Sequence, residues 1–268
     1  MTGRIDAHVH LWRRATDPQP WIDPVTMAVI DRDFAADDLA RMLAATGVDT
    51  AVVVQSVNDL GETQRLLGGP SPVVGWIDLT ADVAAQLEKL GTEGRLVGVR
   101  HLVHVDSDPR WLGRPDVGAS LDTLAAHGLG FDLVVRWWQL ELAAGVAAAR
   151  PGTRFVLDHL GGVAECDDDD GWERGLRALA ALPNVAAKIS GLAALVPDTA
   201  RLRRVTEVAL DAFGPHRLMY GSDWPLALLG VGPVAWRAAV DELTGDLSAD
   251  ERRAVDGGTA AAWYGLEP

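Results

Sequence analysis

The amino-acid sequence predicts a single α/β domain folded as a (β/α)8 TIM barrel, and three observations support this prediction. The chain has 268 residues, close to the roughly 250 typical of that fold. Short apolar runs rich in β-branched residues alternate with stretches of helical periodicity, as in a parallel sheet covered by helices. No linker, low-complexity tract or composition break divides the sequence. We therefore expect residues 1–268 to form one domain.

The predicted strands follow one another without a break at the middle of the chain, which favours a closed barrel over an open sheet. Each is a near-continuous apolar run, as expected for strands buried on both faces. They span Arg4–Trp12, Asp49–Ser56, Val73–Leu79, Leu96–Val103, Leu129–Val135, Thr153–Leu160, Asn184–Ser190 and Arg217–Asp223. The predicted helices include Asp37–Thr46, Ala81–Leu90, Trp138–Ala149, Trp172–Leu182, Arg201–Phe213 and a final helix over Ala249–Trp263. The acidic run Asp167–Asp170 is expected to be a solvated loop.

Charge and cysteine content narrow the classes of function. The formal net charge is −14, from 38 acidic and 24 basic residues, so nucleic acid and anionic membranes are not expected as partners. The single cysteine, Cys166, excludes an intrachain disulfide and a cysteine-rich zinc site. We find no secretory signal pattern and no apolar run as long as a membrane span. The sequence thus favours a cytoplasmic protein with a small-molecule substrate, and it is compatible with a homo-oligomer.

Polar residues gather at the ends of the predicted strands, where TIM barrels carry their active sites. His8 and His10 end the first strand, and because positions i and i+2 of a strand face the same way, they project together. Two adjacent imidazoles can bind one metal ion or donate hydrogen bonds to a developing oxyanion. Asp6, two positions before His8, faces the same way, and we expect it to lie deeper in the barrel and to orient one imidazole.

Asp223 and His159 end two later strands. Asp223 lies in the segment YGSDWP, where Gly221 permits a tight bend and Pro225 ends the strand. A carboxylate there can act as a general base towards water, and its alternative role is to cap the next segment. His159 follows Asp158; since adjacent strand residues face opposite ways, we expect His159 to be the one that points inward.

The fourth and seventh strands add basic residues. Arg100 ends the fourth strand, where a buried guanidinium needs an anionic or carbonyl partner. His101 is then expected to point outward and His104 to lie in the following loop, each with either a substrate or a packing role. Lys188 on the seventh strand is expected to face inward, either in a structural ion pair or in the site.

Taken in order from Arg4 to Leu266, these strand ends form a series of motifs. The series is IDAHVHLW, VVVQS with the later Glu62–Thr63, VVGWIDL, LVGVRHLV, LDHLGG, AAKISGL, RLMYGSDWP and GGTAAAWYGL. It resembles the amidohydrolase superfamily, and within it the amidohydrolase-2 branch that includes L-fuconolactonase-like sugar lactonases. The resemblance implies hydrolysis of a small lactone ring, typically a sugar aldonolactone. Matched by position, it implies catalytic roles for His8, His10, Arg100, His159 and Asp223.

Two departures from the superfamily pattern bear on metal binding. Binuclear members carry a bridging carboxylated lysine or a glutamate on the fourth strand and a histidine on the fifth, whereas this chain has Arg100 and Asp132 there. His8, His10 and Asp223 could still supply the three ligands that zinc needs besides water. The sequence favours a metal-free site, with one Zn or Mn ion as the alternative. The Lys-Pro that often follows the DHLG motif in relatives is Gly162–Val163 here.

The resulting hypothesis is that Asp223 activates a water for attack on the lactone carbonyl. His8, His10, His159 and Arg100 would stabilise the oxyanion, and Asp223 would then protonate the departing ring oxygen. The residues expected to contact the substrate are Gln55, Trp76, Lys188, Trp224 and His101. Substrate choice is expected to depend on the loops Trp12–Phe34 and Ser107–Asp116.

Three alternatives remain at this stage. The first is a metal-dependent hydrolase or decarboxylase of the same branch. The second is a lactonase for a pyrone dicarboxylate, which would need several arginines at the mouth of the barrel and is disfavoured by the acidic net charge. The third is a catalytically silent barrel that binds a ligand. The sequence does not identify the lactone, its ring size or its pathway.

Overall fold

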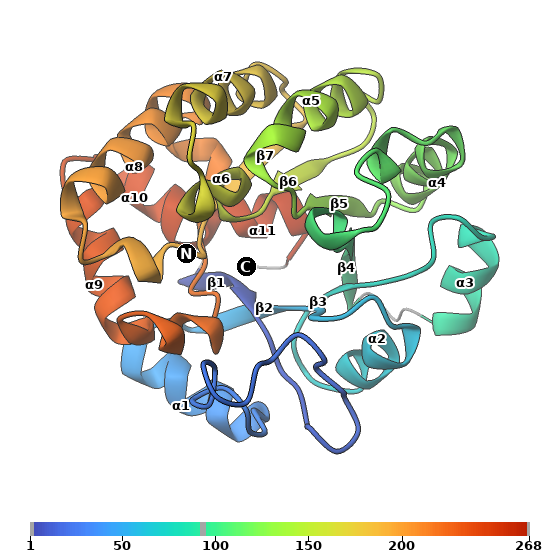
Figure 1. Cartoon of the computed structure of the whole chain (residues 1–268), viewed down its shortest axis with the longest axis horizontal. Coiled ribbons are helices and arrows are strands. Elements are labelled where there is room, and N and C mark those ends of the chain that lie inside the picture. Colours follow the sequence, from blue (N-terminus) through green and yellow to red (C-terminus); the bar gives the residue numbers. More distant parts are fainter. Residues whose placement is uncertain (1–2, 92–94, 267–268) are drawn as a thin grey trace.

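The strands of the computed structural model, which describes residues 3–91 and 95–266, form one parallel sheet in chain order. The sheet curls into a barrel with the helices on its outside (Figure 1). The strands are β1 Ile5–Val9, β2 Thr50–Val54, β3 Val73–Gly75, β4 Leu96–His101, β5 Gly130–Leu133, β6 Phe155–Leu157, β7 Val185–Ile189 and β8 Leu218–Tyr220. The predicted (β/α)8 fold is confirmed.

The helices cover the sheet because one face of each is apolar and faces the strands. Their bounds are α1 Ala36–Thr46, α2 Leu60–Leu67, α3 Val83–Leu90, α4 Pro115–Ala126, α5 Leu140–Ala148, α6 His159–Gly162, α7 Asp169–Ala180, α8 Thr199–Phe213, α9 Gly232–Leu243, α10 Ala249–Arg253 and α11 Thr259–Tyr264. The acidic run Asp167–Asp170 is not the loop that was expected, because Asp169 and Asp170 begin α7, and Asp168 caps this helix by accepting a hydrogen bond from the Gly171 N–H. Among residues 3–91 and 95–266, no helix is long and apolar enough to cross a membrane.

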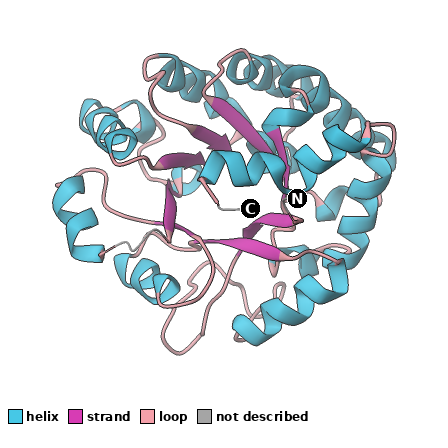
Figure 2. Ribbon diagram, turned by 180° about the vertical axis from the view of Figure 1, so that it is seen from behind, coloured by secondary structure: helices cyan, strands magenta, loops and turns pink. Residues whose placement is uncertain are grey.

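The predicted final helix is interrupted. A π-helical segment, Ala254–Gly258, separates α10 from α11. Gly257 in this segment lies so close to the start of β1 that a Cβ there would sit 2.5 Å from the Gly3 carbonyl oxygen. The close approach lets α11 turn across the end of the barrel (Figure 2), where Tyr264 packs against strand residues that include Ile5 and Val97.

The barrel closes between β1 and the residues that follow β8. The Asp223 N–H donates to the His8 carbonyl oxygen at 2.8 Å, and the His10 N–H donates to the Trp224 carbonyl oxygen at 2.7 Å. Gly221 permits this join by close approach, since a Cβ there would lie 2.9 Å from Cβ of both His8 and Ser190. The hydrogen bonds that close the barrel therefore also bring the predicted catalytic side chains together.

Candidate active site

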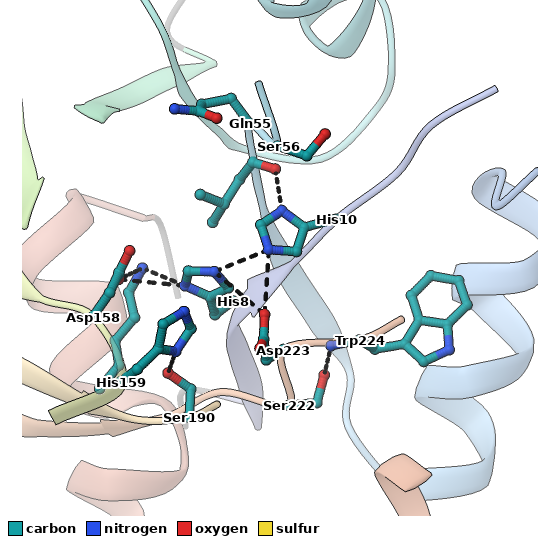
Figure 3. Close-up of polar contacts among 12 residues, drawn as sticks. His8, His10, Gln55, Ser56, Asp158, His159, Ser190, Ser222, Asp223 and Trp224 are labelled. Atoms are coloured by element: carbon teal, nitrogen blue, oxygen red, sulfur yellow. Dashed lines mark hydrogen bonds and ion pairs between the residues drawn. The ribbon is translucent and has the colours of Figure 1, made fainter. Parts of the chain in front are cut away.

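His8 and His10 project side by side from the end of β1 (Figure 3), as predicted. Their Nε2 atoms are 3.2 Å apart. His10 Nδ1 lies 2.8 Å from the Val54 carbonyl oxygen, and because a carbonyl can only accept, this nitrogen carries the proton. The other ring nitrogen, Nε2, faces His8 and Asp223.

Asp223 lies beside both histidines and is held ionised by them. Its Oδ1 is 3.2 Å from His10 Nε2 and 3.7 Å from His8 Nε2. Burial raises the pKa of Asp223, but the interactions with His159, His10 and His8 outweigh burial and bring the pKa to about 2. The carboxylate is thus available as a proton acceptor at neutral pH.

His159 reaches the site through an unusual turn. The four residues His159–Gly162 have φ values of 54°, 48°, 74° and 74°, so α6 is a single left-handed turn. It places the His159 ring centroid 4.6 Å from that of His8, and Nδ1 lies 2.9 Å from Ser190 Oγ. A Cβ at Gly162 would lie 3.0 Å from the Val135 carbonyl oxygen, so the second glycine is also needed for close approach.

Backbone strain coincides with the candidate catalytic residues. Among the described residues, the non-glycine positions with positive φ are His159, Leu160 and Asp223. Such conformations cost energy and persist where the surrounding structure enforces them, most often at functional sites. The backbone therefore supports a functional role for His159 and Asp223, independently of their side-chain chemistry.

Asp158 corrects a prediction. The sequence placed only one of Asp158 and His159 inside, but both lie in the site, because β6 ends at Leu157 and strand alternation ends with it. Asp158 Oδ2 accepts from Arg100 Nη1 at 2.9 Å, and its Oδ1 is 2.9 Å from Lys188 Nζ. The same Oδ1 is 3.3 Å from His8 Nδ1. Asp158 thus connects Arg100 and Lys188 to His8.

A buried ion cluster lies beneath the histidines; we define it as Arg100, Asp132, Asp158 and Lys188. Lys188 Nζ lies 2.6 Å from Asp132 Oδ2 and 3.1 Å from His8 Nδ1. Tyr264 of α11 donates its hydroxyl to the same Asp132 oxygen at 2.7 Å. The four side chains of the buried ion cluster are each 3 % exposed at most. Two carboxylates and two cations balance each other, which lets these charges remain buried.

Asp6 lies below the histidine pair, as expected, but it does not orient an imidazole. Its Oδ1 accepts the backbone N–H groups of His8 and Ser222 at 3.1 and 2.8 Å. Burial raises the pKa of Asp6 to about 6, partly offset by these hydrogen bonds. Asp6 therefore fixes the backbone on both sides of the barrel join rather than a side chain.

A cavity of about 530 Å³ opens above these residues. Its floor includes four of the predicted catalytic residues, His10, Arg100, His159 and Asp223. His8 lies just behind this floor and is fully buried. The predicted catalytic residues are thus brought together at one end of one cavity.

The structure, over its described residues, places none of the five predicted substrate contacts on the cavity wall. Lys188 belongs to the buried ion cluster, and Gln55 Nε2 donates to the Arg100 carbonyl oxygen at 3.1 Å. Trp224 packs edge-on against Phe34, with ring centroids 5.1 Å apart. These three side chains lie beneath the residues of the cavity floor and contact other parts of the protein rather than the cavity.

Trp76 and His101 form a separate pair outside the cavity. Trp76 Nε1 donates to His101 Nδ1 at 3.1 Å, while His101 Nε2 lies 2.8 Å from Asp106 Oδ2. The His101 ring stacks on Trp111 with centroids 3.7 Å apart. His101 is therefore engaged away from the cavity, and His104, in the following turn, lines it instead.

Sequence reasoning missed most of the outer cavity wall, which includes Trp21, Leu102, Val105, Val134, Val135 and Leu226. Trp21 lies in the Trp12–Phe34 loop that the sequence marked for substrate choice. The Ser107–Asp116 loop contributes no described residue to the wall. Val134 and Val135 directly follow β5, so their position at a strand end was the signal available in the sequence.

Three side chains are placed to hold a metal ion. One donor atom from each of His8, His159 and Asp223 lies within 4.8 Å of the others. The set differs from the predicted ligands by exchanging His10 for His159. Burial lowers the pKa of both His8 and His159, which favours the neutral rings that metal ligation requires.

The arrangement agrees with comparisons to known proteins. The family model described as Amidohydrolase matches residues 5–266. An L-fucono-1,5-lactonase of Burkholderia ambifaria is 35% identical over 100% of this chain and 97% of its own length. A second L-fucono-1,5-lactonase, from Burkholderia multivorans, is also 35% identical, over 98% of this chain and 96% of its own.

Solved structures lead to the same family. A Burkholderia multivorans amidohydrolase with bound zinc superposes with a TM-score of 0.91 at 34% identity, covering 98% of this chain and 99% of that one. A 2-pyrone-4,6-dicarboxylic acid hydrolase structure from Pseudomonas putida, at 22% identity and a TM-score of 0.78 over 100% and 99% of the two chains, shares the fold. The motif resemblance is confirmed, and the chain belongs to the amidohydrolase family.

Proposed function

We propose that this protein hydrolyses a lactone ring, of the sugar-lactone type named for its relatives. The observation that carries the proposal is the ionised Asp223, held in a strained backbone conformation at the floor of the cavity. Beside it lie His10 and His159, and Arg100 completes the floor. A base next to polarising donors is what hydrolysis of an ester carbonyl requires.

Asp223 takes a proton from a water in the cavity, and the water oxygen bonds to the lactone carbonyl carbon. Arg100 and the histidines stabilise the charge that develops on the carbonyl oxygen. The bond between that carbon and the ring oxygen then breaks, and Asp223 returns the proton to the ring oxygen. The product is an open-chain hydroxy acid, and Asp223 is regenerated as a carboxylate.

The site also fits one divalent cation, and we propose His8, His159 and Asp223 as its ligands. Asp223 Oδ1 is buried without a hydrogen-bond partner, and one ligand atom from each of the three side chains lies within 4.8 Å of the others. When bound, such an ion would lower the pKa of the attacking water and polarise the carbonyl. We therefore revise the sequence-based preference for a metal-free site.

The metal proposal predicts thermal stabilisation. Zinc or manganese added at about 100 times its Kd is expected to stabilise the fold by about 2.7 kcal/mol, seen as a rise in Tm of several degrees. His159→Asn keeps a side chain that tolerates positive φ but removes one ligand, so its shift should be much smaller. An equal shift in the variant would exclude His159 as a ligand.

A panel of aldonolactones, followed with a pH indicator, tests the proposed function directly. Wild-type protein should acidify the solution well above the spontaneous rate. Pre-treatment with a chelator, followed by zinc or manganese, then measures how far the reaction depends on a metal. If no lactone of any ring size is turned over under either condition, the proposed function is excluded.

The proposed base predicts the acid side of the pH profile. The pKa of Asp223 is depressed to about 2, so the carboxylate is present above that pH and is lost as the pH falls through it. We expect kcat/KM to show no loss due to Asp223 until the pH approaches 2. Short assays after a pH jump measure kcat/KM at each pH. A loss of kcat/KM due to Asp223 with its midpoint at or above about pH 4, the pKa of a free aspartate, would contradict the prediction.

A further inference from the structure

The outer wall of the cavity indicates which lactones fit best. We infer that the preferred substrate is a lactone ring that carries an apolar alkyl substituent, rather than one hydroxylated at every carbon. This inference rests on the proposed lactone hydrolysis and specifies its substrate class. Three features of the wall support it: apolar side chains, polar side chains that are in part already bonded within the protein, and paired charges.

The apolar side chains come from several parts of the chain. Trp21 lies before α1, Leu102 and Val105 follow β4, Val134 and Val135 follow β5, and Leu226 follows β8. They therefore surround the space above the catalytic floor rather than form a patch on one side. Burying one methylene group against such a wall strengthens binding about fourfold.

Ser56 and Trp21, two polar side chains of the wall, are engaged with protein partners, whereas His104 Nδ1 is buried without one. Ser56 donates its hydroxyl to the buried Glu62. Asn58 Oδ1 accepts a backbone N–H at 3.0 Å. Its Nδ2 faces His101 Nε2, which is itself a donor to Asp106, so the Asn58 amide N–H groups remain available. Trp21 Nε1 donates to Gln19 Oε1 at 2.7 Å, which leaves its ring carbons for the cavity. Apart from His104 Nδ1 and the Asn58 amide, ring hydroxyls that leave water would find few free partners here, which weakens the binding of a ring hydroxylated at every carbon.

The charges of the wall are also paired. Arg136 forms an ion pair with Glu165, and Arg100 is bonded to Asp158 at 2.9 Å. Burial, together with Arg100 and Arg136, lowers the pKa of His104 to about 3, so its ring is neutral. A carboxylated substituent would have to displace Glu165 or Asp158 to gain a cation. The wall therefore favours a neutral substituent as well as an apolar one.

A series of six-membered lactones tests the inference. The probes are δ-valerolactone without a substituent, δ-hexalactone with a methyl group, δ-octalactone with a propyl group, and fully hydroxylated gluconolactone. Because these rings differ in reactivity, each kcat/KM is divided by the rate of spontaneous hydrolysis at the same pH. We expect the normalised value to rise roughly tenfold or more from no substituent to propyl and to exceed that of gluconolactone.

The outcomes separate the inference from the proposed function. A higher normalised value for gluconolactone than for the propyl lactone would overturn the inference and leave lactone hydrolysis intact. Values that do not change along the alkyl series would also overturn it. Turnover of none of the four probes, or of sugar lactones in the wider panel, would instead overturn the proposed function.

A pair of variants on one short helix locates the effect. Leu226 and Leu229 both lie on the 3-10 segment Leu226–Leu229, but Leu226 lines the cavity while Leu229 is 41% exposed. Leu226→Gln should lower kcat/KM for the propyl lactone roughly tenfold and change that for the unsubstituted ring far less. Leu229→Gln should change neither. Equal losses on both lactones in Leu226→Gln would contradict a role in binding the substituent.

Discussion

Asp223→Asn is expected to lower kcat for lactone hydrolysis by about 10²- to 10⁴-fold, the contribution usual for a positioned general base. An amide has the same shape as the carboxylate but does not accept a proton from water. Asparagine also tolerates the positive φ of 56° at this position, so the fold should persist. Steady-state kinetics on the lactone panel, with circular dichroism as the check on folding, measure the effect.

Asp122→Asn is the matched control for this substitution. Its side chain is 64% exposed, and it lies on α4, away from the cavity. The same chemical change there should leave kcat unaltered. If Asp223→Asn hydrolysed lactones at the wild-type rate, Asp223 would not be the base and the proposed mechanism would fail.

Lys188→Met is expected to destabilise the protein by about 3–5 kcal/mol, the cost of removing one partner from a buried ion pair. Lys188 is fully buried and lies within 2.9 Å of both Asp132 and Asp158. Methionine has a similar length but leaves these two carboxylates facing each other with Arg100 as the remaining cation of the cluster. Differential scanning calorimetry should show a Tm lowered by roughly 6 to 20 °C.

An exposed ion pair provides the comparison. Arg203 is 53% exposed and lies 3.3 Å from Glu242. Arg203→Met should change stability by less than about 1 kcal/mol, as is usual for surface pairs. Equal effects of Arg203→Met and Lys188→Met would show that the buried ion cluster does not contribute in the way its geometry indicates.

The sequence predicted the fold and the catalytic floor because both follow from local patterns. Apolar runs mark the strands, and the ends of parallel strands meet at one end of a barrel. His8, His10 and Asp223 could therefore be placed near one another without coordinates. Arg100 was placed by the same reasoning, as the fourth strand carries it to the same end.

The parts that were missed depend on backbone geometry outside the strands. Asp158 was assigned to the wrong side because strand alternation was extended beyond Leu157 into a left-handed turn. The five expected substrate contacts lie near strand ends, yet three of them hydrogen-bond or pack behind the floor, and Trp76 and His101 pair with each other outside the cavity. Which side chains reach a cavity depends on how loops such as Trp12–Phe34 fold back, and that is set by contacts between distant residues rather than by local pattern.

The join between β1 and the residues after β8 has a consequence for how this protein refolds. The His8 and Asp223 backbones are bonded to each other across that seam at 2.8 Å, although 215 positions separate them in the sequence. Contacts between such distant residues are expected to form late, because closing a long loop costs chain entropy. A barrel that is still open at this seam, with all its other strands paired, would not yet bring His8 and Asp223 together. Regain of enzyme activity after dilution from denaturant would therefore report closure of the ring itself, whereas circular dichroism would report the helices.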